Sequence, residues 1–153
     1  MPVEVASQAD IGYQDEIWIG RGEGSPLWTQ ILGVETVAMP EKTPEDIDVT
    51  HMQSRGRSRE TIPGLLPVGD MSQEMQYWPL DEGQMIVDEL ATLTETGARE
   101  TVLLEMVVGG LRRTYRSYVT SYTPSGTIGA KRMVTMAAKL FERLETNPRV
   151  VTP

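Results

Sequence analysis

Side chains that could bind a metal ion concentrate in one short segment of the chain. Asp46, Asp48 and His51 form a D-x-D-x-x-H pattern, and carboxylates with an imidazole can ligate a divalent cation. Alternation along an extended strand, however, places both aspartates on one face and the histidine on the other. Because a metal ion needs converging ligands, we expect a polar strand face here and no metal site.

Catalytic and cofactor-binding arrangements have equally little support. His51 is the only histidine, so a Ser-His-Asp triad would have to use it, and no G-x-S-x-G motif is present. Acidic pairs suited to glycoside hydrolysis exist by count alone. The glycine-rich run over residues 20–26 would need a helix directly after it to bind phosphate, but a strand pattern follows. We therefore expect neither an enzyme nor a cofactor.

The excess of acidic residues argues against a protein that binds the backbone of a nucleic acid. The 153 residues include 14 Lys and Arg against 22 Asp and Glu, a formal net charge of −8. Proteins that bind phosphate backbones cluster their basic residues. Arg and Tyr alternate over residues 112–122, but these residue types are also favoured at protein interfaces. A channel that lets DNA pass without holding it remains compatible with this charge.

Length and composition indicate one ordinary domain. The chain contains no Cys, so neither disulfides nor thiolate metal sites are available. No apolar run approaches the roughly 20 residues of a membrane span, and Met1 to Asp10 lacks the features of a signal peptide. We expect the protein to be made in the cytoplasm and to have no membrane partner.

The periodicity of apolar residues predicts mostly strands and one helix. The helix should cover residues 81–96, with Asp81 as its N-cap, Gln84 as the capping-box partner and Gly97 beyond its end. Residues 101–108 are apolar on both faces apart from Glu105, as in a doubly buried strand. Residues 131–145 fit a strand or a second helix. Further strand patterns occupy residues 16–20 and 29–38, which should form a hairpin, and residues 46–50, 71–78 and 112–123.

Two segments are better suited to contacts outside their own domain. Residues 51–67 form a long polar stretch with Arg55, Arg57 and Arg59, longer than loops usually are in compact domains. We expect it to bind an acidic neighbouring subunit. Residues 1–12 have too few apolar side chains to pack alone, so we expect an extended arm that orders on assembly, ahead of a single domain over residues 13–153.

The strand over residues 46–50, the Ser/Arg-rich loop and the turn Ile62-Pro63-Gly64-Leu65 together resemble the siphophage (lambda-like) major tail tube protein family. In that family a D-x-T strand leads into a Ser/Arg-rich loop and an I-P-G-L turn. The similarity continues upstream and downstream through Ile11-Gly12-Tyr13, Glu16-Ile17-Trp18-Ile19-Gly20 and Tyr77-Trp78-Pro79.

The resemblance implies a fold, an assembly and a function. The fold would be mainly β, a β-sandwich or half-barrel with one flanking helix and a long strand over residues 131–145. Inner strands of six subunits would join into a continuous barrel in a hexameric ring. Stacked rings would form the tail tube of a virion, delivering double-stranded DNA without binding it specifically. The implied partners are a tape-measure protein, a tail terminator and baseplate hub proteins.

Two sets of residues are candidates for these surfaces. Those expected to line the channel and make it acidic are Asp46, Asp48, Ser72, Glu74 and Gln76, and those expected between subunits are Arg55, Arg57, Arg59, Ile62, Pro63 and Gly64. The particle could be a phage or a gene transfer particle, and a secretion-system tube is the nearest related assembly. The alternative is a monomeric β-sandwich that binds carbohydrate through Trp18, Trp28 and Trp78.

Overall fold

The computed structural model describes residues 6–7, 14–22 and 25–144. The N-terminal extension predicted over residues 1–12 lies almost wholly outside the described residues and stays a prediction.

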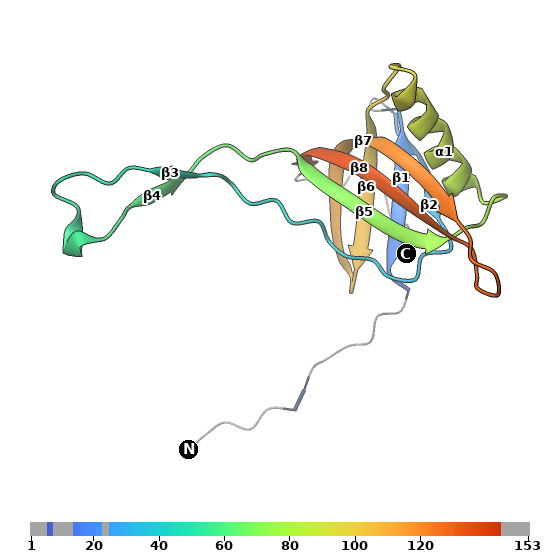
Figure 1. The fold of residues 1–153 in the computed structure, drawn as a ribbon, viewed down its shortest axis with the longest axis horizontal. Coiled ribbons are helices and arrows are strands. Elements are labelled where there is room, and N and C mark those ends of the chain that lie inside the picture. The colour runs from blue at the N-terminus through green and yellow to red at the C-terminus, as the bar shows by residue number, and fades with distance from the viewer. Residues whose placement is uncertain (1–5, 8–13, 23–24, 145–153) are drawn as a thin grey trace.

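The main element is a six-stranded antiparallel sheet with the order β2-β1-β6-β7-β8-β5 (Figure 1). Its strands are β1 Glu16–Arg21, β2 Leu27–Ile31, β5 Gly69–Gln76, β6 Val102–Val108, β7 Leu111–Ser125 and β8 Met133–Leu144. A separate two-stranded hairpin contains β3 Asp46–Asp48, the short 3-10 helix η1 Arg55–Arg57 and β4 Thr61–Pro63. The helix α1 spans Glu82–Glu95. A mainly β fold with one flanking helix is thus confirmed.

Local sequence signals set several of these elements correctly. The β1–β2 and β6–β7 hairpins form, and the latter turns at Gly109 and Gly110, whose φ angles of 56° and 87° suit glycine. The ambiguous segment is the strand β8. The expected strand over residues 29–38 is wrong beyond Ile31, because the chain leaves β2 there and crosses the core with Val34 and Val37 packed against it.

The core lies between one face of the sheet and α1. The helix contributes Val87, Leu90 and Ala91, and full burial of a side chain of Leu or Val size stabilises by about 1.5–3 kcal/mol. β6 is buried on both faces, as its largely apolar sequence predicts, and the burial includes Glu105. No helix in the described part of the chain is long and apolar enough to span a membrane. Sheet residues of this core include Ile17, Ile19, Leu104, Met106, Val119, Met136 and Leu140.

The N-terminus of α1 is capped as predicted, but one role was assigned wrongly. The Asp81 carboxylate accepts a hydrogen bond from the Gln84 backbone N–H at 3.1 Å, and Gly97 follows the helix with φ of 88°. Gln84 does not complete a capping box. Its side chain points into the core and is 1% exposed.

The Gln84 amide joins four separate points of the fold. Its Nε2 donates to the Leu32 carbonyl at 2.8 Å and to the Gln76 carbonyl at 2.7 Å. Its Oε1 accepts from the Trp78 N–H at 3.0 Å and from the Tyr122 hydroxyl at 2.8 Å. Two donors and two acceptor sites are therefore all used, which is the full capacity of an amide.

These bonds hold together the two outer strands of the sheet. Just after β2, Gly33 accepts from the Gln76 N–H at 2.8 Å, and Val34 forms a bridge with Met75 of β5. We call this contact of residues 32–34 with residues 75–78 the seam. Gly33 has φ of 86°, and a Cβ there would lie 3.0 Å from both the Gln76 carbonyl and Gln84 Nε2. The sheet is thus curved round to a half-barrel that closes at one end.

Replacing Gln84 by leucine should test the seam. Gln84→Leu keeps a similar volume but leaves four polar groups without a partner, and each buried unsatisfied group costs about 1–3 kcal/mol. We expect the free energy of unfolding to fall by at least about 3 kcal/mol in urea denaturation. Tyr122→Phe removes one of the four bonds and should cost about 1 kcal/mol. Equal losses in the two variants would contradict a central role for the amide.

Tyr122 should also make stability depend on alkaline pH. Burial, with smaller effects of Tyr77 and Asp88, raises the pKa of the Tyr122 hydroxyl from 10.0 to about 12. A raised pKa in the folded state contributes stability that is complete below the unfolded pKa of about 10 and is lost as pH rises towards the folded value. Tyr122→Phe should therefore lose less unfolding free energy than the wild type between pH 10 and about 12. Parallel losses in both proteins would contradict this.

Candidate assembly surfaces

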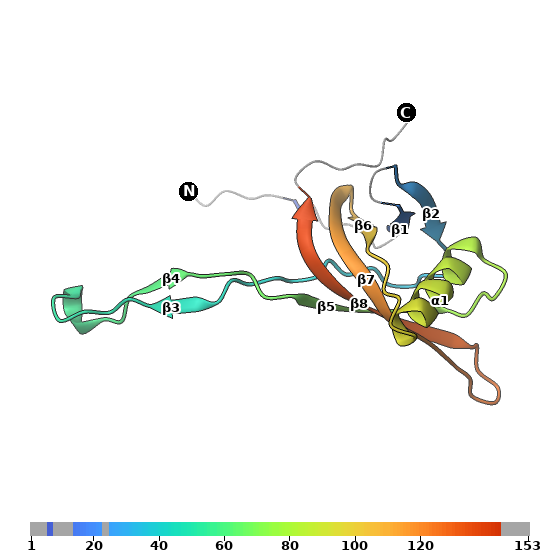
Figure 2. The same ribbon diagram turned by 90° about the horizontal axis from the view of Figure 1, so that it is seen from above.

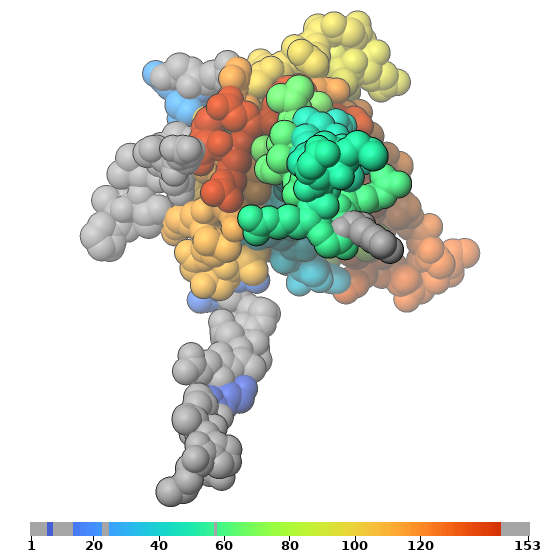
Figure 3. Space-filling model, turned by 90° about the vertical axis from the view of Figure 1, so that its left-hand side faces the viewer, coloured from blue at the N-terminus to red at the C-terminus, as the bar shows by residue number. Residues whose placement is uncertain are grey.

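Residues 41–68 leave the half-barrel as a long projection, which we call the arm (Figures 1 and 2). Within it β3 and β4 pair antiparallel, with Ile47 opposite Ile62. Residues 51–67 are thus the tip and return strand of a hairpin. Its strands are exposed on both faces: Ile47 is 48% and Val49 38% exposed. Seen end on, the arm stands in front of the sheet (Figure 3).

The arm is amphipathic. Ile47, Val49 and Ile62 share one face, whereas Asp46 and Asp48 share the other. Ile47 lies across the backbone of Gly64, where a Cβ would approach its Cδ1 to 2.9 Å. An isolated two-stranded hairpin is at best marginally stable in water. The arm therefore needs polar contacts of its own at the tip or a partner for its apolar face.

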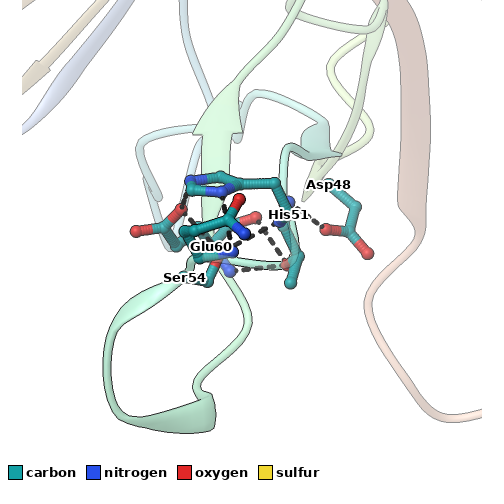
Figure 4. Close-up of polar contacts among 6 residues, drawn as sticks. Asp48, His51, Ser54 and Glu60 are labelled. Atoms are coloured by element: carbon teal, nitrogen blue, oxygen red, sulfur yellow. Dashed lines mark hydrogen bonds and ion pairs between the residues drawn. The ribbon is translucent and has the colours of Figure 1, made fainter.

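Glu60 organises the tip of the arm (Figure 4). Its Oε2 accepts from the Ser54 hydroxyl at 3.0 Å and lies 3.5 Å from His51 Nε2. Its backbone N–H donates to Thr50 Oγ1 at 2.8 Å, and its carbonyl accepts from the Val49 N–H at 2.9 Å. The tip is therefore held by short-range polar contacts.

Asp48 adds a second set of contacts beside Glu60. Its Oδ1 accepts from the Thr50 N–H at 2.9 Å, and its Oδ2 from Arg59 Nη1 at 3.0 Å. These bonds, led by those from Thr50, lower the pKa of the Asp48 carboxyl. His51 Nδ1 accepts from the Gln53 N–H at 3.2 Å, so the imidazole is occupied by Glu60 and Gln53 and faces neither Asp46 nor Asp48. Within the described residues, no three acidic or histidine side chains form a group that could hold a metal ion.

All six candidates for inter-subunit contacts lie together on the arm. Arg55 and Arg57 belong to η1, and the Arg59 guanidinium is engaged with Asp48 although it is 84% exposed. Ile62 and Pro63 are in β4, and Gly64 follows it. The sequence analysis did not identify the structural role of Glu60. The one indication of it in the sequence is that this carboxylate stands alone between a basic stretch and a strand.

The five channel candidates fall into two groups. Ser72 and Glu74 are exposed on the face of β5 that points away from the core, whereas Gln76 is half-buried and donates to Glu35 at 2.9 Å. Asp46 and Asp48 lie on the arm and not on this face. The outward face of β5 continues into β8 and β7 through small and hydroxyl side chains: Thr135 beside Glu74, Ala137 beside Ser72, and then Thr123 and Ser121.

The charges at the edges of this outward face are paired. Asp70 contacts Lys139, and this hydrogen bond raises the pKa of the lysine ammonium. Glu35 contacts Lys131, which lowers the pKa of the Glu35 carboxyl, with Gln76 adding to the effect. Lys139 and Lys131 are thus each offset by a carboxylate.

The three tryptophans do not share one exposed face. Trp18 and Trp28 lie partly buried on β1 and β2, and the Trp28 ring covers Gly20 so closely that a Cβ there would be 2.9 Å away. Trp78 is in the connection between β5 and α1, and its Nε1 donates to Gln76 at 3.1 Å. This arrangement gives the carbohydrate-binding alternative no support.

Known proteins resemble the chain in sequence pattern and in fold. The family model described as "Lambda phage tail tube protein, TTP" matches residues 17–145. Among curated proteins no match was found.

Solved structures share the fold at low identity. A chain in the tail of an empty gene transfer agent (GTA) particle with C6 symmetry is 17% identical, with a TM-score of 0.65, over 86% of this chain and 96% of that one. A chain of the anti-feeding prophage (AFP) baseplate is 9% identical, with a TM-score of 0.65, over 91% and 96%. A chain from the PVC sheath/tube terminator of an extracellular contractile injection system is 8% identical, with a TM-score of 0.60, over 92% and 98%.

Removing the Glu60 carboxylate should loosen the tip of the arm and leave the half-barrel intact. Glu60→Ala loses the contacts with Ser54 and His51, together about 1 kcal/mol of local stability. We expect amide hydrogen exchange over residues 50–60 to quicken by about three- to tenfold, with global unfolding changed by less than about 0.5 kcal/mol. Glu45→Ala, an exposed carboxylate on the same arm, is the control. Unchanged exchange at the tip would contradict this role for Glu60.

Proposed function

Because the chain belongs to the lambda phage tail tube protein family, we propose that its subunits form hexameric rings that stack into the tube of a virion tail. The match of the family model over residues 17–145 carries this proposal. The chain is a structural tube subunit, and the C6 symmetry of the similar GTA tail supports six subunits to a ring. The proposed ring works by its shape, so no catalytic group or cofactor is needed.

Sheet edges give a physical reason for the ring. In the described subunit β2 and β5 are the outer strands, and the seam joins them at one end only. Unpaired edges promote association, and joining strands between neighbouring subunits round a closed ring removes them. Association that closes within the ring and repeats along the axis produces a tube of indefinite length.

The outward face of β5, β8 and β7 is our proposal for the wall of the channel. Ser72, Glu74 and Gln76 lie there, among small and hydroxyl side chains, whereas Asp46 and Asp48 lie on the arm. The cations on this wall are paired with carboxylates, Lys139 with Asp70 and Arg116 with Glu142, so such a wall would hold a phosphate only weakly. Double-stranded DNA could therefore pass without being held, in a phage or a gene transfer particle.

The remaining partners follow from the same assembly. Residues 1–12 would order against a neighbouring subunit, and the tube would enclose a tape-measure protein during growth in the host cytoplasm. A tail terminator and baseplate hub proteins would bind its two ends. Similar folds in a tube terminator, a terminating cap and a baseplate support tube assembly of this kind.

Mass and symmetry test the proposal directly. Size-exclusion chromatography with light scattering should show multiples of the 17.0 kDa chain, and electron microscopy should show rings or tubes with sixfold symmetry. The carbohydrate-binding alternative predicts a monomer at every concentration. A protein that remains monomeric even in concentrated solution would contradict the proposed function as a tube subunit.

Deleting residues 54–59 should abolish tubes but leave a folded subunit. The deletion removes the tip of the arm and its three arginines, far from the core, so circular dichroism and thermal unfolding should match the wild type. Charge-assisted pairs across an interface fix its register as well as adding affinity, so tube formation should be lost. Replacing the six residues by Gly and Ser, which keeps the length of the arm, should have the same effect. Tubes of normal length from the deletion variant would contradict the role of the arm.

A further inference from the structure

The seam end of the subunit carries an exposed apolar patch. Its members are Leu32, Trp78, Leu80 and Met85, which are 42%, 42%, 90% and 55% exposed, and we call them the seam-end patch. Their backbones meet at Asp81, whose carboxylate accepts from the Leu32 N–H at 3.2 Å and whose carbonyl accepts from the Met85 N–H at 2.9 Å. Exposed apolar groups that are gathered in this way mark interaction sites more often than single exposed residues do.

The solvent face of α1 beside this patch is acidic. The helix contains Glu82, Asp88, Glu89 and Glu95 and no Lys or Arg. Glu89 is paired with Arg21 of β1 at 3.0 Å. This face therefore favours a cationic partner.

The arm offers the complementary chemistry. Met52 is 94% exposed at its tip, and Ile47 and Ile62 are each 48% exposed along it. Arg55 lies at the tip, and Arg59 lies beside it with one nitrogen bound to Asp48. Contact with the patch would bury apolar side chains on both sides, and the arginines would meet the carboxylates of α1. Complementary charge of this kind raises specificity and association rate.

The two surfaces lie at opposite ends of one molecule. The arm projects from one end of the half-barrel, whereas the connection from β5 to α1, residues 77–81, lies at the other end (Figures 1 and 2). An arm that points away from its own seam-end patch can meet only the patch of another copy. A contact between unlike ends of identical subunits is heterologous and repeats without closing along an axis.

We propose that the arm of one subunit binds the seam-end patch and the acidic face of α1 of a second copy. This inference rests on the proposed function and names the surface that receives the arm. Met52 packs beside Leu80 and Met85, and Arg55 and Arg59 bind the carboxylates of Glu82 and Asp88. The acidic neighbour expected for the basic arm is thus a second copy of this chain.

Crosslinking between single cysteines tests the contact, since the natural chain has no Cys. Met52→Cys and Leu80→Cys proteins are purified separately, mixed, assembled and treated with a short bismaleimide. A covalent dimer that needs both variants is expected. The control pairs Met52→Cys with Leu111→Cys, an exposed leucine at the β6–β7 turn. Crosslinking to position 111 but not to position 80, or equal crosslinking to both, would overturn the proposal.

A second variant separates this inference from the proposed function. Leu80→Asp places a charge in the patch at a position that is 90% exposed, so the subunit should still fold. Burial of a leucine side chain is worth about a tenfold change in affinity or more, so the concentration needed for tubes should rise at least about tenfold. Leu80→Met, the matched control, should assemble as the wild type does.

The outcomes distinguish two failures. Normal tubes from a folded Leu80→Asp protein would overturn the receiving surface and leave the tube function standing. A wild-type protein that forms neither rings nor tubes would overturn the proposed function and this inference with it.

Discussion

The buried amide of Gln84 is the constraint on which the rest of the half-barrel depends. It ties the end of β2 to the end of β5 and fixes both to α1 and β7 through Leu32, Gln76, Trp78 and Tyr122. An amide suits this position because a buried charge would need a counter-ion and an apolar side chain would leave backbone groups unpaired. Two glycines make the close approach possible: a Cβ would lie 3.0 Å from Gln84 Nε2 at Gly33, and 2.5 Å from the Gln30 carbonyl oxygen at Gly83.

Closure of the seam determines where the arm leaves the structure. The chain passes from β2 through the seam, crosses the core at Val34 and Val37, runs out along the arm and returns as β5 to the same seam. The arm is therefore the segment that connects β2 to β5, and both strands are fixed at the seam. Opening the seam would release both anchors, and the arm would lose its orientation relative to the sheet. Stability at Gln84 and assembly through the arm are in this sense linked.

The sequence predicted elements that depend on neighbouring residues and failed where distant segments meet. The cap at Asp81, the Gly109-Gly110 turn and the doubly buried β6 each follow from a local pattern. The role of Gln84 and the end of β2 at Ile31 do not follow from a local pattern. Both depend on contacts between residues about fifty positions apart in the chain. The motif that resembles tail tube proteins located the arm, but alternation alone could not show that β3 pairs only with β4, away from the sheet.

An exposed amphipathic arm could associate non-specifically with other proteins, and its composition reduces this risk. Ile47 and Ile62 are available to any apolar surface, and a free β-ribbon can pair with other edges. β3 and β4 are each three residues long, Asp46 and Asp48 charge one face, and Pro63 removes a backbone donor. Local bonds around Glu60 further keep the tip from offering free backbone. Random edge pairing is thereby disfavoured, so binding by the arm depends on a surface that matches both its apolar face and its arginines.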